Sequence, residues 1–288
     1  MLGLDPDPAR LWPQAYEQVA GTAAGGNPQV AAALASQAVQ AHCGLVIDAV
    51  AEHCVAVKLQ LACFERLGVS GWRAMVAVIA HARRAGLLVI ADAKRGDIDV
   101  SAAAYGQAFF GHTASPYGEV PGLGVDALTV NPLLGGDSLG PLVDAARGAG
   151  AGLFVLVRTS NPGASDVQEL SLSEGATVSD RLARLVAGLA PDGSGLSDVG
   201  AVVGATAPGR LEALRDLMPR AVFLLPGVGA QGGRVEDLAP AFAPGPAGGL
   251  VAVSRGLVQA HEREGGDPAP AAAREARRLR ELAWRLAA

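Results

Sequence analysis

The sequence predicts an α/β protein built as one (β/α)₈ barrel domain over residues 1–288. Its length suits such a barrel, which typically takes about 250 residues. Short apolar runs alternate with longer Ala- and Leu-rich segments, and polar residues stand at the C-terminal ends of most runs. In a barrel these ends converge on one mouth, whereas in the alternative, a doubly wound open sheet, they would be spread along an edge. We therefore favour the barrel.

Seven apolar runs rich in Val, Leu and Ile predict strands buried on both faces, as in parallel sheets. They are residues 55–60, 87–92, 127–130, 152–157, 199–204, 221–225 and 250–254. Residues 1–4 are the candidate for an eighth, very short strand. Because a barrel strand needs about five residues, either this strand is truncated or the true start lies upstream.

Helices are predicted between these strands. Residues 29–51 are Ala-rich and form one long helix or two, and residues 71–85 carry apolar side chains at helical spacing. Pro208 suits the first turn of a helix. The other helices are expected at residues 99–110, 138–147, 179–189, 208–217 and 271–286. Residues 190–197 and the Pro/Gly-rich residues 239–249 are predicted to be loops, the second of them mobile.

Composition limits the possible partners. The formal net charge of −5 gives no field that would attract nucleic acid or an anionic membrane, so a phosphorylated substrate would need a local cationic site. The three cysteines lack metal-ligand spacing, which indicates reduced thiols in a cytoplasmic protein without a structural metal. The first residues have no secretory pattern, and no uninterrupted apolar stretch reaches about 18 residues, so no membrane helix is expected.

The main chemical motif is Asp92-Ala-Lys94-Arg-Gly-Asp97, at the end of a hydrophobic strand. Period-two spacing directs the side chains of Asp92 and Lys94 to the same side of the strand, which in a barrel is the interior. Flanking carboxylates favour the charged form of a lysine, and a protonated lysine aimed at a reacting carbon is a general acid. The alternative is that Asp97 only N-caps the next helix and Lys94 is a solvated loop residue.

Two strands run into loops that are typical of phosphate binding. One loop reads Pro226-Gly-Val-Gly-Ala-Gln231-Gly232-Gly, and its glycines would let backbone N–H groups approach a phosphate. The other reads Ser254-Arg255-Gly256, and Arg255 would supply a bidentate cationic contact. The loops after strands seven and eight are the usual phosphate site of barrels. Ordinary turn chemistry is the alternative for each loop.

Two further strands carry polar residues. Lys58 lies inside the apolar run 55–60 and needs a carboxylate partner if it is buried, for which Asp5 and Asp92 are the candidates. A lysine that snorkels to the barrel rim is the alternative. Ser160 follows another strand in the segment Arg158-Thr-Ser160-Asn-Pro-Gly163. The alternative is that this segment is an ordinary loop at the end of the strand. Four histidines in helical stretches are interpreted as structural or surface residues: His42, His53, His81 and His112.

Taken in order, these motifs resemble the orotidine 5′-phosphate decarboxylase family, most closely its longer bacterial branch. The resemblance spans nearly the whole chain, and the DAKRGDI and PGVGAQGG segments are its most specific parts. The motifs that carry it are Gly3-Leu-Asp5-Pro, Val57-Lys58, Asp92-Ala-Lys94-Arg-Gly-Asp97-Ile98, Thr129-Val-Asn131-Pro, Thr159-Ser160-Asn161-Pro-Gly163, Pro226-Gly-Val-Gly-Ala-Gln231-Gly-Gly and Ser254-Arg255-Gly256.

The resemblance implies decarboxylation of orotidine 5′-phosphate (OMP) to UMP and CO₂, the last step of de novo pyrimidine synthesis, without a metal or cofactor. It implies that Lys94 donates a proton to C6 of the pyrimidine and that Asp92 lies against the substrate carboxylate. Lys58 and Asp5 would contact the ribose, Ser160 the pyrimidine ring, Pro226 the base, and Gln231 and Arg255 the phosphate. The implied catalytic residues are Lys94, Asp92, Lys58 and Asp97. The implied substrate-binding residues are Asp5, Ser101, Thr129, Asn131, Ser160, Pro226, Gln231, Gly232, Ser254 and Arg255.

The resemblance also implies a cytoplasmic homodimer in which Asp97 and the residue four positions later reach the neighbouring subunit's site. That residue is Ser101 here and usually Thr in the family, so the hydroxyl is kept and we expect a small effect. Ser254 stands where the family usually has Gly. If its backbone N–H contacts the phosphate, its side chain must point away.

Two other functions remain open. Hexulose-phosphate synthases and ketogulonate-phosphate decarboxylases share the Asp-x-Lys-x-x-Asp strand but use Mg²⁺ and an enediolate, so activity in EDTA discriminates them. A non-catalytic barrel would bind UMP without consuming OMP. The Ser160 and Gln231 motifs favour the pyrimidine substrate.

Overall fold

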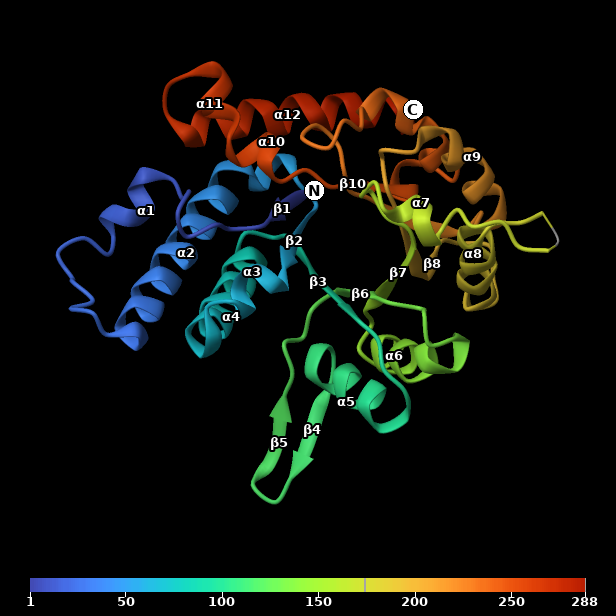
Figure 1. The fold of residues 1–288 in the computed structure, drawn as a ribbon, viewed down its shortest axis with the longest axis horizontal. Helices are drawn as coiled ribbons and strands as arrows, with labels where there is room; N and C mark the ends of the chain where they lie inside the picture. Colours follow the sequence, from blue (N-terminus) through green and yellow to red (C-terminus); the bar gives the residue numbers. More distant parts are fainter. Residues whose placement is uncertain (174, 288) are drawn as a thin grey trace. The chain divides into compact units, whose positions relative to one another are not determined.

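The computed structural model describes residues 1–173 and 175–287. Eight strands form one sheet in the order β1-β2-β3-β6-β7-β8-β9-β10, and helices connect them (Figure 1). All eight predicted strands are present, and their order along the sheet follows the chain without the reversal of a doubly wound sheet. The strands are β1 Leu2–Leu4, β2 Ala56–Gln60, β3 Leu88–Arg95, β6 Ala127–Val130, β7 Gly152–Arg158, β8 Ser197–Val203, β9 Ala221–Leu225 and β10 Gly249–Val251.

All the predicted helices are present, with ends shifted by a few residues. They are α2 Pro28–Val50, α4 Gly68–Arg84, α5 Asp99–Phe109, α6 Gly136–Gly148, α8 Val178–Gly188, α9 Pro208–Leu217 and α12 Pro268–Ala287. Short elements that the sequence did not predict are α1 Pro13–Glu17, α3 Leu61–Glu65, α7 Ala164–Val167, α10 Arg255–Val258, α11 Ala260–Glu264, the 3₁₀ turn η1 Ala51–His53, and a hairpin of β4 His112–Ser115 and β5 Gly118–Pro121. Elements of five residues or fewer are too short to show a helical period.

Local signals explain where several helices begin. The Asn27 side chain accepts hydrogen bonds from the backbone of Gln29 and Val30, and Pro28 occupies the first turn of α2. Thr177 and Asp180 form a reciprocal capping box at the start of α8. Pro208 begins α9, as predicted.

The chain folds as two compact units. The first comprises Met1–Ala93 and Ser254–Arg280, and the second comprises Lys94–Val253 and the residues from Glu281 onward. In the first unit β1 and β3 flank β2 in parallel, and α2 packs against α4. In the second unit β6 to β10 pair in parallel, with Leu128, Val155 and Phe223 fully buried. A single domain over residues 1–288 stays a prediction.

Helix α2 bears on the expectation that the chain has no membrane helix, which stays a prediction. Residues 28–53 are long enough and apolar enough, by length and composition, to cross a membrane. A helix that covers the core of a soluble protein has the same properties, and α2 buries Val39, Cys43, Val46 and Ile47 within the first unit. Cys43 is a free thiol, as are the other two cysteines, and burial raises its pKa above the usual value.

The segment predicted as a mobile Pro/Gly-rich loop is instead formed by two 3₁₀ elements, η2 Val235–Phe242 and η3 Pro246–Gly248. The buried Arg215 of α9 donates hydrogen bonds to the carbonyls of Ala241 (2.7 Å) and Gly248 (3.0 Å). The same guanidinium lies 3.7 Å from the centre of the Phe223 ring. A single arginine therefore holds both turns, which local composition does not reveal.

Candidate active site

A charged cluster lies at the C-terminal ends of the first strands. Lys58 Nζ on β2 lies 2.6 Å from Asp92 Oδ2 on β3 and 3.9 Å from Asp5 Oδ1, which follows β1. Lys58 and Asp92 are only 8% and 9% exposed. Buried charges of this kind persist only when they are paired, so the predicted carboxylate partners of Lys58 are confirmed and the snorkelling alternative is wrong.

Gln60 joins this cluster and was missed by the sequence analysis. In the amide orientation that satisfies both of its polar atoms, Nε2 donates to Asp92 Oδ2 (2.8 Å) and to the Asp92 carbonyl (3.1 Å). Gln60 is the last residue of β2, so the signal was its position at a strand end. The Asp92 carboxylate is therefore held from two sides.

Lys94 lies near the end of β3 but does not follow the predicted alternation of side chains. Its φ of +48° leaves the extended region, and the residue is exposed whereas Asp92 is buried. Period two holds only while the backbone is extended, so spacing alone does not set the direction of the lysine. The Lys94 N–H donates to Oγ1 of the fully buried Thr129 at 3.0 Å, which fixes the backbone at this point.

Asp97 does not cap α5, so the capping alternative is wrong. Its Oδ1 accepts from the adjacent Ile98 N–H at 2.8 Å, while Ile98 is the N-cap residue and no side chain of the described residues caps the helix. Ser101 is exposed in the first turn of α5. Asp97 and Ser101 are thus not required for the start of α5.

The segment after Lys94 is tied to the end of β6. The Asn131 N–H donates to the Arg95 carbonyl at 2.7 Å. A Cβ at Gly96 would lie 2.7 Å from the Asn131 carbonyl oxygen, so only glycine allows this close approach. The structure therefore brings the predicted residues Thr129 and Asn131 next to the Lys94–Asp97 segment.

The loops after β7 and β9 meet at Gly227, which has a φ of +102°. A Cβ at Gly227 would lie 2.9 Å from Ser160 Cβ and 3.0 Å from Gln231 Oε1, so both side chains converge on the space above this glycine. The loop is closed by bonds from Gly233 N–H to the Gly227 carbonyl (3.0 Å) and from Gly232 N–H to the Gly229 carbonyl (2.8 Å). Its geometry is that of a compact Gly-rich turn with one amide side chain.

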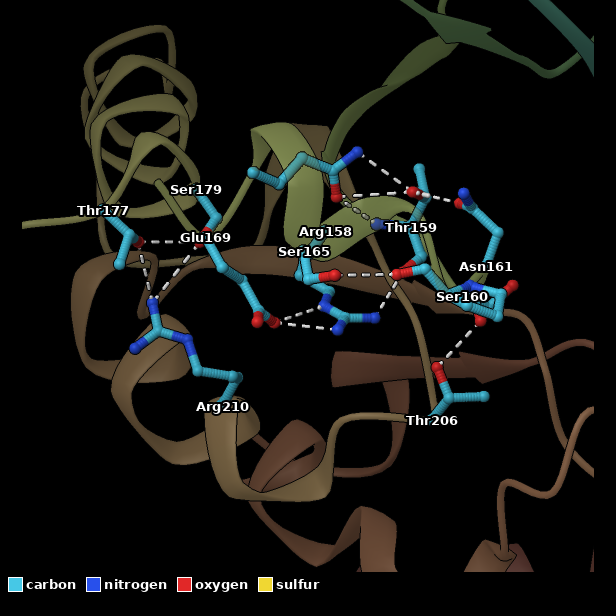
Figure 2. Close-up of polar contacts among 12 residues, drawn as sticks. Arg158, Thr159, Ser160, Asn161, Ser165, Glu169, Thr177, Ser179, Thr206 and Arg210 are labelled. Atoms are coloured by element: carbon cyan, nitrogen blue, oxygen red, sulfur yellow. Dashed lines mark hydrogen bonds and ion pairs between the residues drawn. The ribbon is translucent and has the colours of Figure 1, made fainter. Parts of the chain in front are cut away.

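Pro226 and Thr206 belong with Ser160, Gly227 and Gln231 in a second group of site residues. The Pro226 carbonyl accepts from Ala205 N–H at 2.8 Å. Thr206 Oγ1 donates to the Ser160 carbonyl at 3.0 Å (Figure 2). The sequence analysis missed Thr206. This polar residue follows β8, and a search for polar residues after the end of that strand, as made for the other strands, would have found it.

Ser254 and Arg255 lie where the chain leaves β10 and enters α10. Ser254 Cβ lies 3.0 Å from the position that a Cβ on Gly3 would take. The serine side chain thus occupies the space left by the missing side chain of Gly3. Arg255, the first residue of α10, is exposed.

The predicted site residues fall into two sets. Asp5, Lys58, Asp92, Ser254 and Arg255 belong to the first unit, whereas Lys94, Asp97, Ser101, Thr129, Asn131, Ser160, Pro226, Gln231 and Gly232 belong to the second. Within residues 1–173 and 175–287, no group of three or more His, Cys, Asp or Glu side chains is arranged to hold a metal ion.

Known proteins resemble this chain over most of its length. Residues 28–266 match the model of the orotidine 5′-phosphate decarboxylase / HUMPS family. The chain is 46% identical over 228 residues to the orotidine 5′-phosphate decarboxylase of Rhodopirellula baltica, covering 77% of this chain and 73% of the relative. It is 47% identical over 236 residues to that of Deinococcus radiodurans, covering 80% and 79%.

Solved structures share the fold. A candidate orotidine 5′-phosphate decarboxylase of Streptomyces avermitilis is 36% identical, with a TM-score of 0.75, over 99% of this chain and 90% of that one. The OMP decarboxylase of Leishmania donovani is 28% identical, with a TM-score of 0.70, over 98% and 92%. The predicted (β/α)₈ fold class is confirmed.

Proposed function

The chain belongs to the orotidine 5′-phosphate decarboxylase / HUMPS family, and we propose that it converts OMP to UMP and CO₂ without a metal or cofactor. The observation that carries this proposal is the buried ion pair between Lys58 and Asp92, which places opposite charges at the ends of β2 and β3 just before Lys94. The names of the relatives at 46% and 47% identity support the same reaction.

The proposed chemistry is direct decarboxylation at C6. The bond between C6 and the carboxylate carbon breaks, CO₂ leaves, and the electron pair that stays on C6 takes a proton from Lys94 Nζ. The ammonium group stabilises the developing carbanion before it gives up that proton. Asp92, beside the substrate carboxylate, raises the energy of the ground state through charge repulsion. Lys58 pairs with Asp92 and, with Asp5, contacts the ribose.

The remaining residues bind the nucleotide. Ser160 hydrogen-bonds the pyrimidine and Gln231 contacts the phosphate, and the convergence of the two side chains at Gly227 supports contact with one ligand. Pro226 lines the base pocket. Arg255 supplies the cationic phosphate contact, and its exposure leaves the guanidinium accessible. The other substrate-binding residues in this proposal are Gly232, Ser254, Thr129 and Asn131. Phosphate binding energy, gained far from C6, serves to order the site.

The enzyme is proposed to be a cytoplasmic homodimer in which Asp97 and Ser101 reach the neighbouring subunit's site. Exposed apolar side chains support this. Val100 is 82% exposed beside Ser101, and Leu133 is 80% exposed two residues after Asn131, whose backbone is bonded to Arg95. Large apolar side chains left in solvent on neighbouring segments mark an interaction surface.

The direct test is to incubate the purified chain with OMP in excess EDTA and to follow the ultraviolet absorbance. We expect OMP to be consumed at the same rate with and without EDTA, and UMP to form. Loss of turnover in EDTA would favour the Mg²⁺-dependent relatives on this scaffold. Binding of UMP without consumption of OMP would indicate a non-catalytic barrel.

A further inference from the structure

The loop that carries Ser160 is held by side chains from three segments (Figure 2). The Thr159 N–H donates to Gln168 Oε1 at 2.8 Å, just after α7, and Gln168 Nε2 donates to Thr159 Oγ1 at 3.0 Å. The Thr159 hydroxyl in turn donates to Asn161 Oδ1 at 2.7 Å. One glutamine therefore bonds both the backbone and the side chain of the residue before Ser160.

The peptide group on the N-terminal side of Ser160 is fixed by Arg158. Its Nη1 donates to the Thr159 carbonyl at 2.7 Å, while Nη2 and Nε donate to Glu169 Oε1 at 2.8 and 3.1 Å. Arg158 is 8% exposed. A buried guanidinium with a carboxylate partner and a carbonyl acceptor has little freedom to move.

The peptide group on the C-terminal side of Ser160 is fixed by Thr206. The Thr206 hydroxyl donates to the Ser160 carbonyl at 3.0 Å. The backbone of Ser160 also packs on Gly204, where a Cβ would lie only 2.8 Å from Ser160 Cα. With the two flanking peptide planes held, the direction of the Ser160 Cα–Cβ bond is set, and it places Cβ beside Gly227 and Gln231.

We propose that Thr206 and Arg158 are positioning residues that direct the Ser160 hydroxyl to the pyrimidine of the substrate. The inference rests on the proposed function, because only there does Ser160 contact the pyrimidine. Neither residue contacts the ligand in this scheme, and both act on the peptide groups beside Ser160. Their loss affects recognition of the base and leaves recognition of the phosphoribosyl part unchanged.

Thr206 offers a matched pair of variants. Thr206→Val removes the donor and keeps the shape, whereas Thr206→Ser keeps the donor and loses a methyl group. We expect Thr206→Val to lower kcat/KM for OMP and affinity for UMP by about five- to tenfold, the effect of one lost hydrogen bond. Thr206→Ser should stay within about twofold of wild type, and binding of ribose 5-phosphate should be unchanged in both.

A double-mutant cycle separates positioning from a general loss of stability. In a Ser160→Ala background, Thr206→Val should change kcat/KM by less than about twofold, because the hydroxyl that it positions is already gone. Ser165→Ala is the control, because its hydroxyl donates to the Pro162 carbonyl on the same loop without touching the peptides that flank Ser160. Its kinetics should match wild type.

The outcomes are distinguishable. Equal losses for UMP and ribose 5-phosphate, additive effects in the cycle, or a Thr206→Ser variant as impaired as Thr206→Val would each overturn the positioning role. If Thr206→Val does not fold, the Thr206→Ser variant provides the test. A folded Thr206→Ser variant that loses kcat/KM for OMP would overturn the positioning role. Absence of OMP turnover by the wild-type chain would instead sink the proposed function.

Discussion

Lys58 and Lys94 are the two lysines of the sequence, and its other strongly basic side chains are arginines. Arginine would keep the positive charge at either position, but its guanidinium does not release a proton in proteins and its planar fork is larger. Lysine offers a compact ammonium whose proton is transferable. In the proposed reaction the residue at position 94 transfers a proton, which a lysine ammonium can do. The residue at position 58 must be a compact cation, because its nitrogen lies 2.6 Å from Asp92 Oδ2.

Two substitutions at Lys94 distinguish the role of its positive charge from the role of its transferable proton. We expect both Lys94→Ala and Lys94→Arg to lower kcat for OMP by about a thousandfold or more, since neither side chain donates a proton to C6. Binding of UMP, measured by calorimetry, should survive in both. The exposed Arg84→Ala of α4 serves as the control with unchanged turnover. Normal turnover by Lys94→Ala would remove Lys94 from the proposed role.

At the scale of elements, a buried histidine joins α2 to the segment that leads into α1. His42 is 2% exposed, and its Nδ1 accepts from the Trp12 N–H at 3.0 Å. The Trp12 indole in turn donates to the Val258 carbonyl at 2.8 Å, at the end of α10. Burial lowers the pKa of His42 to about 4 from its usual 6.5, so the folded protein holds a neutral imidazole at neutral pH. The interpretation of His42 as structural is supported by these contacts.

This histidine makes stability depend on pH. The unfolded chain binds a proton near pH 6.5 and the folded chain only near pH 4, so the stabilisation is complete above pH 6.5 and falls as the pH drops toward 4. The loss amounts to about 3 kcal/mol of unfolding free energy. His42→Asn should reduce the pH slope in urea titrations, because its amide oxygen accepts from Trp12 without titrating. His112→Asn, on the exposed strand β4, is the control. Equal slopes for His42→Asn and wild type would contradict the assignment.

At the scale of the whole molecule, the proposed function depends on assembly into a dimer. If Asp97 completes the site of the partner subunit, an Lys94→Ala chain and an Asp97→Ala chain are each inactive alone but complement each other when mixed. In a hybrid dimer, one site combines the intact Lys94 of one chain with the intact Asp97 of the other. The second site carries both substitutions.

After the two variants are unfolded and refolded together in equal amounts, we expect about a quarter of the wild-type turnover, because half of randomly paired dimers are hybrids. Each variant refolded alone sets the baseline. A mixture no more active than that baseline would show that Asp97 acts within its own chain or not at all.

The sequence by itself determined the order of strands and helices, because apolar runs and their turn residues are local signals. It also determined that Lys58 needs a carboxylate, because a charge inside an apolar strand must be paired. Only the tertiary structure decided the direction of Lys94, the place of the Ser254 side chain, and the conformations of residues 235–248 and of the loop that carries Ser160. A positive φ at Lys94 overrides the period-two rule, and Gly3 makes room for the Ser254 side chain. Arg215 orders a segment that composition assigns to a loop, and Arg158 and Thr206 fix the peptides beside Ser160. Most of these contacts join residues far apart in the chain. Arg158 bonds the adjacent Thr159, and the direction of Lys94 depends on one backbone angle. None of these features leaves a periodic pattern in the sequence.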